Sequence, residues 1–321
     1  MKNLKYTIKN ISILVASSFI LLTSSATAKS NEKIKAVATF SILGDMVKRI
    51  GGDHVLLTTL VGPNGDTHVY QPTPTAAKAM SEAKVLIVNG LGFEGWLDRL
   101  VEASDFDGKR VIATLGIKAI NNEEGDDHDK HAEDKHKDSH ADHDHGAFDP
   151  HGWQSVANAV IYVNNITAAL SQVAPEKAST FYQNRAVYMA EINRLHKQIL
   201  EMVASLPQNT RTVVTSHDAF QYFGRDYGLT FLAPQGLSTE SEASAKDVAA
   251  LIEQMRSKNI KAVFVENITD PRLLKQIAKE TGATIGGTLY PGALSESNGP
   301  APTYLKLMHH NAKTLIQALG S

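Results

Sequence analysis

Apolar positions recur along the chain in two alternating patterns, short continuous runs and longer amphipathic runs. Short apolar runs bounded by turn residues are typical of buried strands, and amphipathic runs are typical of helices that cover a sheet. The predicted strands are Ile34–Thr39, Val55–Val61, Lys84–Val88 and Arg110–Leu115, then Arg211–Thr215, Thr230–Leu232, Lys261–Val265 and Ala283–Leu289. Alternation of this kind predicts an α/β fold with two lobes.

Helices are predicted between these strands and at the end of the chain. They cover Ile42–Ile50, Thr75–Ala83, Glu94–Ala103, Ala219–Tyr227, Ser244–Ser257, Pro271–Thr281 and Pro302–Leu319. The segment Gly62–Pro74, after the second strand, contains three prolines and two glycines. Because these residues interrupt regular structure, we expect a loop there.

Two more helical segments follow Trp153, and the second of them, Pro175–Leu206, is unusually long. No glycine or proline interrupts it after Pro175, which suits a first helical turn, and Pro207 stops it. Its apolar stripe is Phe181, Tyr188, Ile192, Leu195, Ile199, Met202 and Leu206. At 1.5 Å per residue it would be roughly 48 Å long, against about 30 Å for a small domain. We therefore expect it to join the two lobes as a rigid helix.

The N-terminal residues 1–28 have the pattern of a secretory signal peptide. Lys2, Lys5 and Lys9 form a positive region, Ile11–Leu22 an apolar core, and Ala26–Ala28 an A-x-A cleavage site. The chain contains no cysteine, so it has no thiol to carry a lipid and no thiolate metal site. We expect export, cleavage after Ala28, and a soluble periplasmic protein that is not a lipoprotein.

Composition and charge narrow the class of protein further. The formal charge is −2, and residues 123–146 alone hold ten carboxylates and three lysines. The rest of the mature chain is therefore close to neutral and carries no basic stripe for nucleic acid. We expect four segments: the signal peptide 1–28, a first lobe 29–174, a linking helix 175–206 and a second lobe 207–321.

The acidic segment 123–146 also contains six histidines, at positions 128, 131, 136, 140, 143 and 145. So polar a segment cannot bury enough apolar surface to fold, and neutral imidazole binds Zn²⁺, Cu²⁺ and Ni²⁺. A charge run is usually only a solvated surface, but one histidine in every four residues favours metal contact. We expect a disordered loop in which His128, His131, His136, His140, His143 and His145 form weak accessory metal sites.

Three other histidines follow predicted strands. His68 lies in the loop Gly62–Pro74, His151 follows Asp149-Pro150, and His217 lies where a strand leads into a helix. Ligands of parallel α/β sheets bind beyond the carboxyl ends of the strands, so two facing lobes would bring these histidines into one cleft. Each one, taken singly, is more often a hydrogen-bonded structural residue.

The segments around these histidines resemble the motifs of a known family. GDTHVYQPTP, FDPHGWQS, TSHDAFQYFGRDYGL and GGTLYPGALSESNGPAPTY are similar to those of the metal-binding receptors of ABC importers, which take up zinc or manganese. The resemblance covers essentially the whole mature chain. It implies two (β/α)4-type lobes joined by a long helix, and a metal held in the cleft between them by His68, His151 and His217.

The resemblance also bears on the choice of metal. The zinc-specific, ZnuA-like branch has a histidine- and acid-rich insertion, as this chain has at 123–146, while manganese receptors usually place a carboxylate where this chain has His217. Imidazole favours Zn²⁺ over the harder Mn²⁺. Many members carry an aspartate ligand where this chain has Gly292. The fourth ligand is then water or a loop histidine; Glu266 is less favoured, because a structural salt bridge explains it equally well.

The function that follows is a periplasmic receptor that delivers Zn²⁺ to the membrane permease of an ABC transporter with its cytoplasmic ATPase. We expect a monomer and no enzymatic activity. A manganese or other divalent-metal receptor of the same family is the alternative. A periplasmic zinc buffer and a zinc-dependent hydrolase are less favoured, the latter because the chain has no H-E-x-x-H motif. His54, His196, His309 and His310 are expected to be structural.

Overall fold

The computed structural model describes residues 32–122 and 147–320. The predicted signal peptide and the histidine-rich segment 123–146 lie outside these residues. Every element discussed below belongs to one compact unit, Lys33–Ser321.

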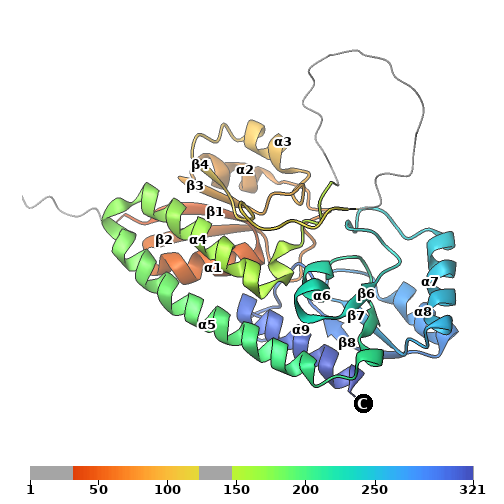
Figure 1. Cartoon of the computed structure of the whole chain (residues 1–321). Coiled ribbons are helices and arrows are strands. Elements are labelled where there is room, and N and C mark those ends of the chain that lie inside the picture. The colour runs from red at the N-terminus through yellow and green to blue at the C-terminus, as the bar shows by residue number, and fades with distance from the viewer. Residues whose placement is uncertain (1–31, 123–146, 321) are drawn as a thin grey trace, which may run out of the picture. The chain divides into compact units, whose positions relative to one another are not determined.

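The described residues form two four-stranded sheets, one in each lobe (Figure 1). The first contains β1 (Ile34–Phe40), β2 (Val55–Val61), β3 (Val85–Val88) and β4 (Lys109–Ile112), and the second β5 (Thr212–Val214), β6 (Thr230–Leu232), β7 (Ala262–Glu266) and β8 (Thr284–Leu289). Their strand orders, β2-β1-β3-β4 and β6-β5-β7-β8, are equivalent, and all the pairings are parallel. The expected two-lobed α/β fold is confirmed.

Eight helices accompany the two sheets in the described part of the chain. They are α1 (Ser41–Gly51), α2 (Pro74–Ser81), α3 (Leu97–Ala103) and α4 (Val156–Val173) in the first lobe, and α6 (Gln221–Tyr227), α7 (Ala245–Ser257), α8 (Arg272–Thr281) and α9 (Tyr304–Leu319) in the second. Thr73, Ser155, Ser244 and Thr303 cap four of them, each side chain accepting a hydrogen bond from a backbone N–H of the first turn. Such caps satisfy N–H groups that the helix itself leaves unpaired.

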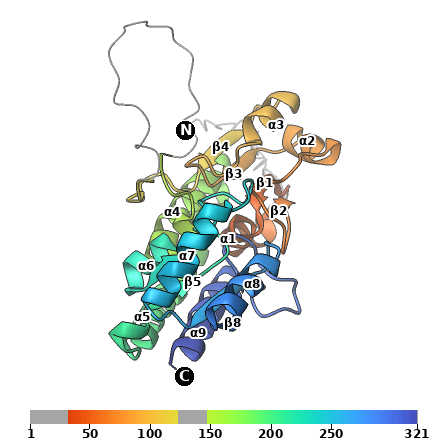
Figure 2. The same ribbon diagram turned by 90° about the vertical axis from the view of Figure 1, so that its right-hand side faces the viewer.

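The long helix α5 (Ala178–Ala204) follows a single 3₁₀ turn, Pro175–Lys177. It packs against α1 and α4 of the first lobe and against α6 and α9 of the second, as Figures 1 and 2 show. Phe181, Tyr188, Ile192 and Ile199 of the predicted stripe are buried, whereas Met202 is only half-buried and Val203 is buried in its place. The long helix therefore shares its apolar face between the two lobes.

A few predicted element limits are wrong by two or three residues. The fourth strand ends at Ile112, not Leu115, because the chain turns at Thr114 to Gly116. Helix α3 begins at Leu97, not Glu94, because the buried Glu94 side chain accepts hydrogen bonds from the backbone N–H groups of Asn89 and Gly90. Those bonds hold a turn at the carboxyl end of β3.

The residues that flank segment 123–146 are joined by hydrogen bonds. Asn121 and Phe148 form an antiparallel bridge, the N–H of Asn122 donates to the carbonyl of Ala147 at 3.0 Å, and that of Asp149 donates to Ile120 at 2.9 Å. Residues on both sides of the segment therefore hold the backbone just before His151.

Candidate metal centre

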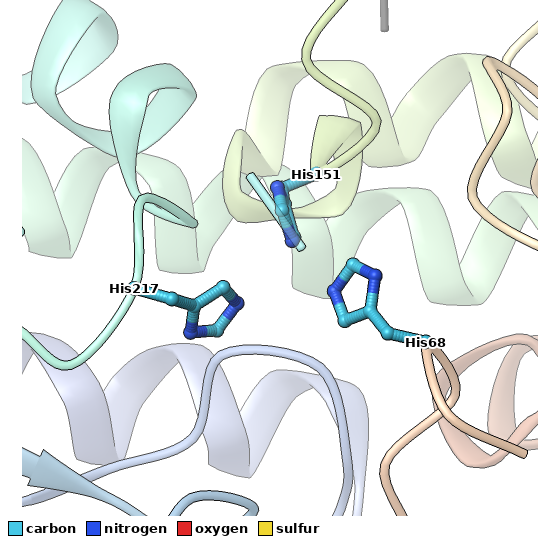
Figure 3. A group of neighbouring side chains, drawn as sticks. All are labelled: His68, His151 and His217. Carbon is cyan, nitrogen blue, oxygen red and sulfur yellow. The ribbon is translucent and has the colours of Figure 1, made fainter. Parts of the chain in front are cut away.

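The structure brings His68, His151 and His217 together, the first two from one lobe and the third from the other (Figure 3). Each offers one ring nitrogen, and these atoms all lie within 4.8 Å of one another. The ring centroids are 5.4–5.7 Å apart. Among the described residues, this is the one group of three or more histidine or carboxylate side chains whose spacing suits a metal ion.

His68 lies in the loop between β2 and α2. Asp66 Oδ1 accepts a hydrogen bond from the backbone N–H of His68 at 3.0 Å, and Trp96 Nε1 donates to the carbonyl of Thr67 at 2.9 Å. Asp66 Oδ2 also accepts from the hydroxyl of Thr239, a residue of the second lobe, at 2.5 Å. The residues directly before the histidine are thus fixed by contacts from both lobes.

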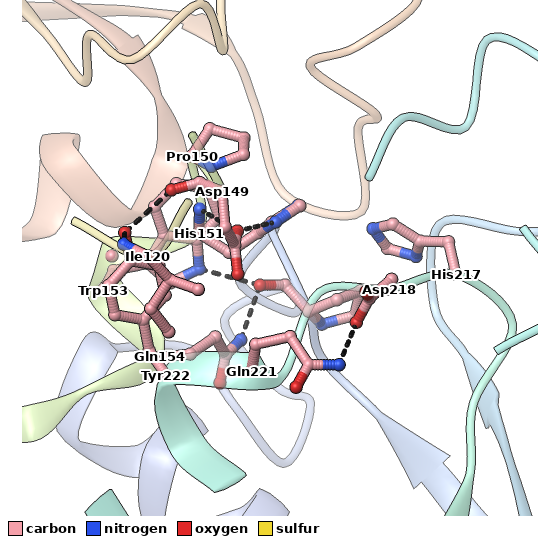
Figure 4. Close-up of polar contacts among 12 residues, drawn as sticks. Ile120, Asp149, Pro150, His151, Trp153, Gln154, His217, Asp218, Gln221 and Tyr222 are labelled. Carbon is pink, nitrogen blue, oxygen red and sulfur yellow. Dashed lines mark hydrogen bonds and ion pairs between the residues drawn. The ribbon is translucent and has the colours of Figure 1, made fainter. Parts of the chain in front are cut away.

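His151 is held by Asp149, as Figure 4 shows, and by contacts to the two residues before it. Asp149 Oδ1 accepts from the His151 backbone N–H at 2.9 Å and from His151 Nδ1 at 2.8 Å. The Asn89 side chain donates to the carbonyl of Pro150 at 2.9 Å, and Tyr222 of the second lobe donates to the carbonyl of Asp149 at 2.8 Å. Both the ring and the backbone of His151 are therefore fixed.

His217 follows β5 and pairs with the end of β7. Glu266 Oε2 accepts from His217 Nδ1 at 2.6 Å, while Glu266 Oε1 accepts from the backbone N–H groups of Ser216 and His217 at 3.0 and 3.2 Å. Both side chains of the pair are fully buried. Since Glu266 already holds the ring of His217, this contact assigns it a supporting position behind a ligand.

The Nε2 atoms of all three histidines are buried and have no hydrogen-bond partner. A buried nitrogen without a partner costs about 1–3 kcal/mol, so three of them facing one another need an explanation. A metal ion supplies it, because neutral imidazole coordinates through the nitrogen that is not occupied by its carboxylate partner. The arrangement of His151 and His217 thus fits the donor set of a divalent metal.

Burial and charge set the protonation of the three rings. Burial, followed by the neighbouring histidines, holds the pKa of His68 well below its usual value, and burial does the same to the pKa of His151. Burial also opposes protonation of His217, but the charge and hydrogen bond of Glu266 outweigh it and raise the pKa of His217. Burial raises the pKa of Asp149 to about 7.

Aromatic side chains form the apolar wall behind the histidines. The ring of Phe93 meets that of His68 edge-on at 4.9 Å between centroids, and Trp153 lies 5.3 Å from His151. Phe40 packs against both aromatic residues. This wall excludes water from one side of the cluster and strengthens electrostatic contacts within it.

The fourth ligand position is not filled by a side chain at Gly292. A Cβ added at Gly292 would lie 3.8 Å from Trp153 and 3.9 Å from Ile268, which are ordinary contacts. The backbone is held by Trp153 Nε1 and Gln154 Nε2, which donate to the carbonyl of Pro291 at 2.7 and 2.6 Å. The loop histidines from His128 to His145, the other predicted source of a fourth ligand, lie outside the described residues.

The other histidines of the described residues do not belong to the cluster. His196 Nδ1 and the Tyr227 hydroxyl are 2.9 Å apart, His310 Nε2 is 3.0 Å from the carbonyl of Thr288, and the ring of His54 packs edge-on against Phe181. His309 lies with His310 on α9, whose buried stripe includes Tyr304, Met308 and Ala312 as expected.

Several supporting residues were not expected from the sequence. Asn89 joins three segments: its side chain donates to Pro150 and accepts from the Tyr162 hydroxyl at 2.8 Å, and its carbonyl accepts from Thr114. Glu94, which also accepts from Thr39 at 2.6 Å, anchors the same turn. An Asn-Gly pair directly after a strand was the available signal, but it does not identify the distant Pro150 as a partner.

Three comparisons place the chain among known proteins. The profile of the family described as zinc-uptake complex component A, periplasmic (ZnuA), matches residues 36–318. The iron-binding protein YfeA of Yersinia pestis is 31% identical over 94% of this chain and 92% of its own, and the manganese-binding lipoprotein MntA of Bacillus subtilis is 32% identical over 92% and 93%. The solved structure of the periplasmic zinc-binding protein TroA of Treponema pallidum is 27% identical, with a TM-score of 0.80 over 90% of this chain and 99% of that one.

Proposed function

The chain belongs to the ZnuA family, the metal-binding receptors of ABC importers, and we propose that its cargo is Zn²⁺, held by His68, His151 and His217 and delivered to a membrane permease with its cytoplasmic ATPase. Receptors of this family are periplasmic or otherwise extracytoplasmic, and they bind their solute without transforming it. In this proposal the protein is a monomeric periplasmic receptor. Zn²⁺ is the cargo and not a resident cofactor.

The observation that carries the proposal is the set of three buried Nε2 atoms without partners. Zn²⁺ accepts imidazole nitrogens at about 2.0–2.1 Å in tetrahedral geometry. Mn²⁺ is better suited to oxygen ligands, and the cluster of described residues contains none. A site with nitrogen ligands alone therefore favours zinc.

Manganese or another divalent metal is the second candidate cargo. It is favoured by the names of the relatives, since MntA is described as manganese-binding and YfeA as iron-binding. Asp66, whose side chain contacts the backbone of His68, would be a nearby source of oxygen if the loop shifted.

We also propose the division of the chain and its state in the cell. The signal peptide 1–28 is followed by the lobe 29–174, the linking helix 175–206 and the lobe 207–321. MntA is named a lipoprotein, but this chain contains no cysteine, so we propose export without lipidation. Within the described residues, no helix combines the length and apolar character needed to span a membrane.

Metal competition on the purified mature protein tests the cargo. The metal-free protein is mixed with equal concentrations of Zn²⁺ and Mn²⁺, and the bound metal is identified by native mass spectrometry. The proposal expects one Zn²⁺ per chain and its loss when all three histidines are replaced by alanine. Preferential binding of Mn²⁺ would establish the second candidate. Zinc bound as tightly by the triple variant as by the wild type would show that the tight site lies elsewhere.

A further inference from the structure

A cavity of about 480 Å³ adjoins the histidine cluster and has His68 in its wall. Residues of both lobes line it, among them Phe93 and Trp96 from the first and Leu237 from the second. Its volume lies in the usual range for small-molecule pockets, about 300–1,000 Å³, and far exceeds the roughly 30 Å³ of one water molecule. One member of the histidine cluster, His68, therefore borders a space large enough for a small organic molecule.

The walls of this cavity suit a flat ring. Tyr70 and Trp96 pack together with their ring centroids 4.8 Å apart, and Phe93 lies against the ring of His68. Phe148 also lines the cavity, and its side chain is 40% exposed. Such aromatic surfaces favour a planar partner, which packs against their faces or edges.

The same cavity carries one positive and one negative side chain, Arg99 of α3 and Glu240 of the second lobe. Within residues 32–122 and 147–320, neither of these side chains forms an ion pair or a side-chain hydrogen bond. A guanidinium binds a carboxylate through two parallel hydrogen bonds, and a carboxylate binds an ammonium group. One charge of each sign matches the head group of an α-amino acid.

The metal site supplies the third point of recognition. Zn²⁺ takes four ligands, the cluster provides three imidazoles, and Gly292 has no side chain to provide the fourth. We propose that the cavity binds an α-amino acid with an imidazole side chain, whose ring nitrogen completes the coordination of the metal. Arg99 holds its carboxylate and Glu240 its ammonium group, so that metal and amino acid are captured together. This inference rests on the proposed zinc site and adds a ligand class to it.

Equilibrium dialysis with radiolabelled L-histidine tests this inference on the mature protein loaded with one equivalent of Zn²⁺. We expect about one L-histidine per chain with zinc and at least tenfold weaker retention without it. Arg99→Gln should weaken retention tenfold or more while leaving the binding of zinc alone unchanged. Arg194→Gln, which alters an exposed arginine on α5 away from the cavity, should behave as the wild type.

Histamine serves as the matched probe, because it has the imidazole and amine of histidine but no carboxylate. It should bind the wild type at least tenfold more weakly than L-histidine does, and Arg99→Gln should abolish that difference. Equal retention of L-histidine by wild type and Arg99→Gln would overturn the inference, as would transfer of the zinc from the protein to L-histidine in the dialysate. If the protein retains zinc alone but no L-histidine, the inference fails and the zinc site stands. If it retains no zinc, the proposed function itself fails.

Discussion

His151 and His217 occupy comparable positions in the two lobes, and each donates Nδ1–H to a buried carboxylate. The two carboxylates lie at very different distances along the sequence from their histidines. Asp149 is only two residues from His151, whereas Glu266 is 49 residues from His217 and belongs to the neighbouring strand β7. Glu266 also accepts two backbone hydrogen bonds, and Asp149 accepts one.

The pKa values of the two histidines are shifted in opposite directions. The pKa of His217 is raised by Glu266, while burial leaves the pKa of His151 lowered and that of its partner Asp149 raised to about 7. A buried carboxylate with little hydrogen-bond support tends to take up a proton, as the raised pKa of Asp149 indicates. Similar geometry in the two lobes therefore gives the two histidines different proton affinities.

Removing one of the three histidines, from either lobe, should have the largest effect on zinc affinity. Structural zinc sites bind with about 10–16 kcal/mol, so each of four ligands contributes a few kcal/mol and its loss should weaken binding about a hundredfold or more. We expect this for His68→Ala, His151→Ala and His217→Ala, measured by competition titration with a zinc chelator. His196→Ala is the control, since that ring contacts Tyr227. If one of the three substitutions has no more effect than the control, that residue is not a ligand.

Neutralising the supporting carboxylates should weaken metal binding by different amounts in the two lobes. Removing a carboxylate that accepts a hydrogen bond from a metal-bound histidine typically lowers metal affinity by 10–100-fold. We expect Glu266→Gln to lie near the upper limit and Asp149→Asn near the lower, because Asp149 is partly protonated near pH 7. The same titration measures both variants, with circular dichroism as a check on folding. Equal losses would show that the backbone contacts of Glu266 do not distinguish the pairs.

As the pH falls, zinc affinity should decline first because of protonation of His217. Because Glu266 raises the pKa of His217 above its usual value, protons compete with zinc for this ring at a higher pH than they would at an ordinary histidine. Affinity should therefore fall by up to about tenfold per pH unit as the pH drops through that pKa, whereas His68 and His151 begin to compete only at lower pH. Titrations from pH 8 to 5.5 measure this. Glu266→Gln should move the decline to lower pH, and an unchanged profile would contradict the assignment.

Restoring an oxygen ligand at Gly292 should change selectivity more than overall affinity. The position accepts an added Cβ at ordinary contact distances, and a carboxylate suits Mn²⁺ better than an imidazole does. We expect Gly292→Asp to raise affinity for Mn²⁺ about tenfold, measured by competition between the two metals. Gly292→Ala controls for the added Cβ. An equal response to both substitutions would mean that the carboxylate does not reach the metal.

Replacing residues 123–146 by a short Asn-Gly turn should leave the tight site unchanged. Asn121 and Phe148 already form an antiparallel bridge, which such a turn can close. Calorimetry should still show one tightly bound zinc, without the weaker additional sites expected from six histidines. Loss of the tight site would mean that a loop histidine is an essential ligand.

The fold and the three histidines were largely predictable because each rests on local pattern. Apolar periodicity located all the described strands to within a few residues, and Pro150 or a strand end marked each histidine. Asp149 could in principle have been identified as well, since it lies two residues from His151. No local sequence pattern identifies partners that are distant in sequence, such as Asn89 for Pro150.

The sequence by itself determined the alternation of strands and helices, the long linking helix, the absence of cysteine and the nitrogen character of the site. Only the tertiary structure decided which ring nitrogens face one another, which carboxylate supports each ring, and that a cavity with Arg99 and Glu240 adjoins His68. Periodicity records whether a position is buried, because burial acts on each residue separately. Pairing depends on how two lobes and the loops at their strand ends pack, as when Glu266 meets His217 across 49 residues, and local sequence does not encode that distance.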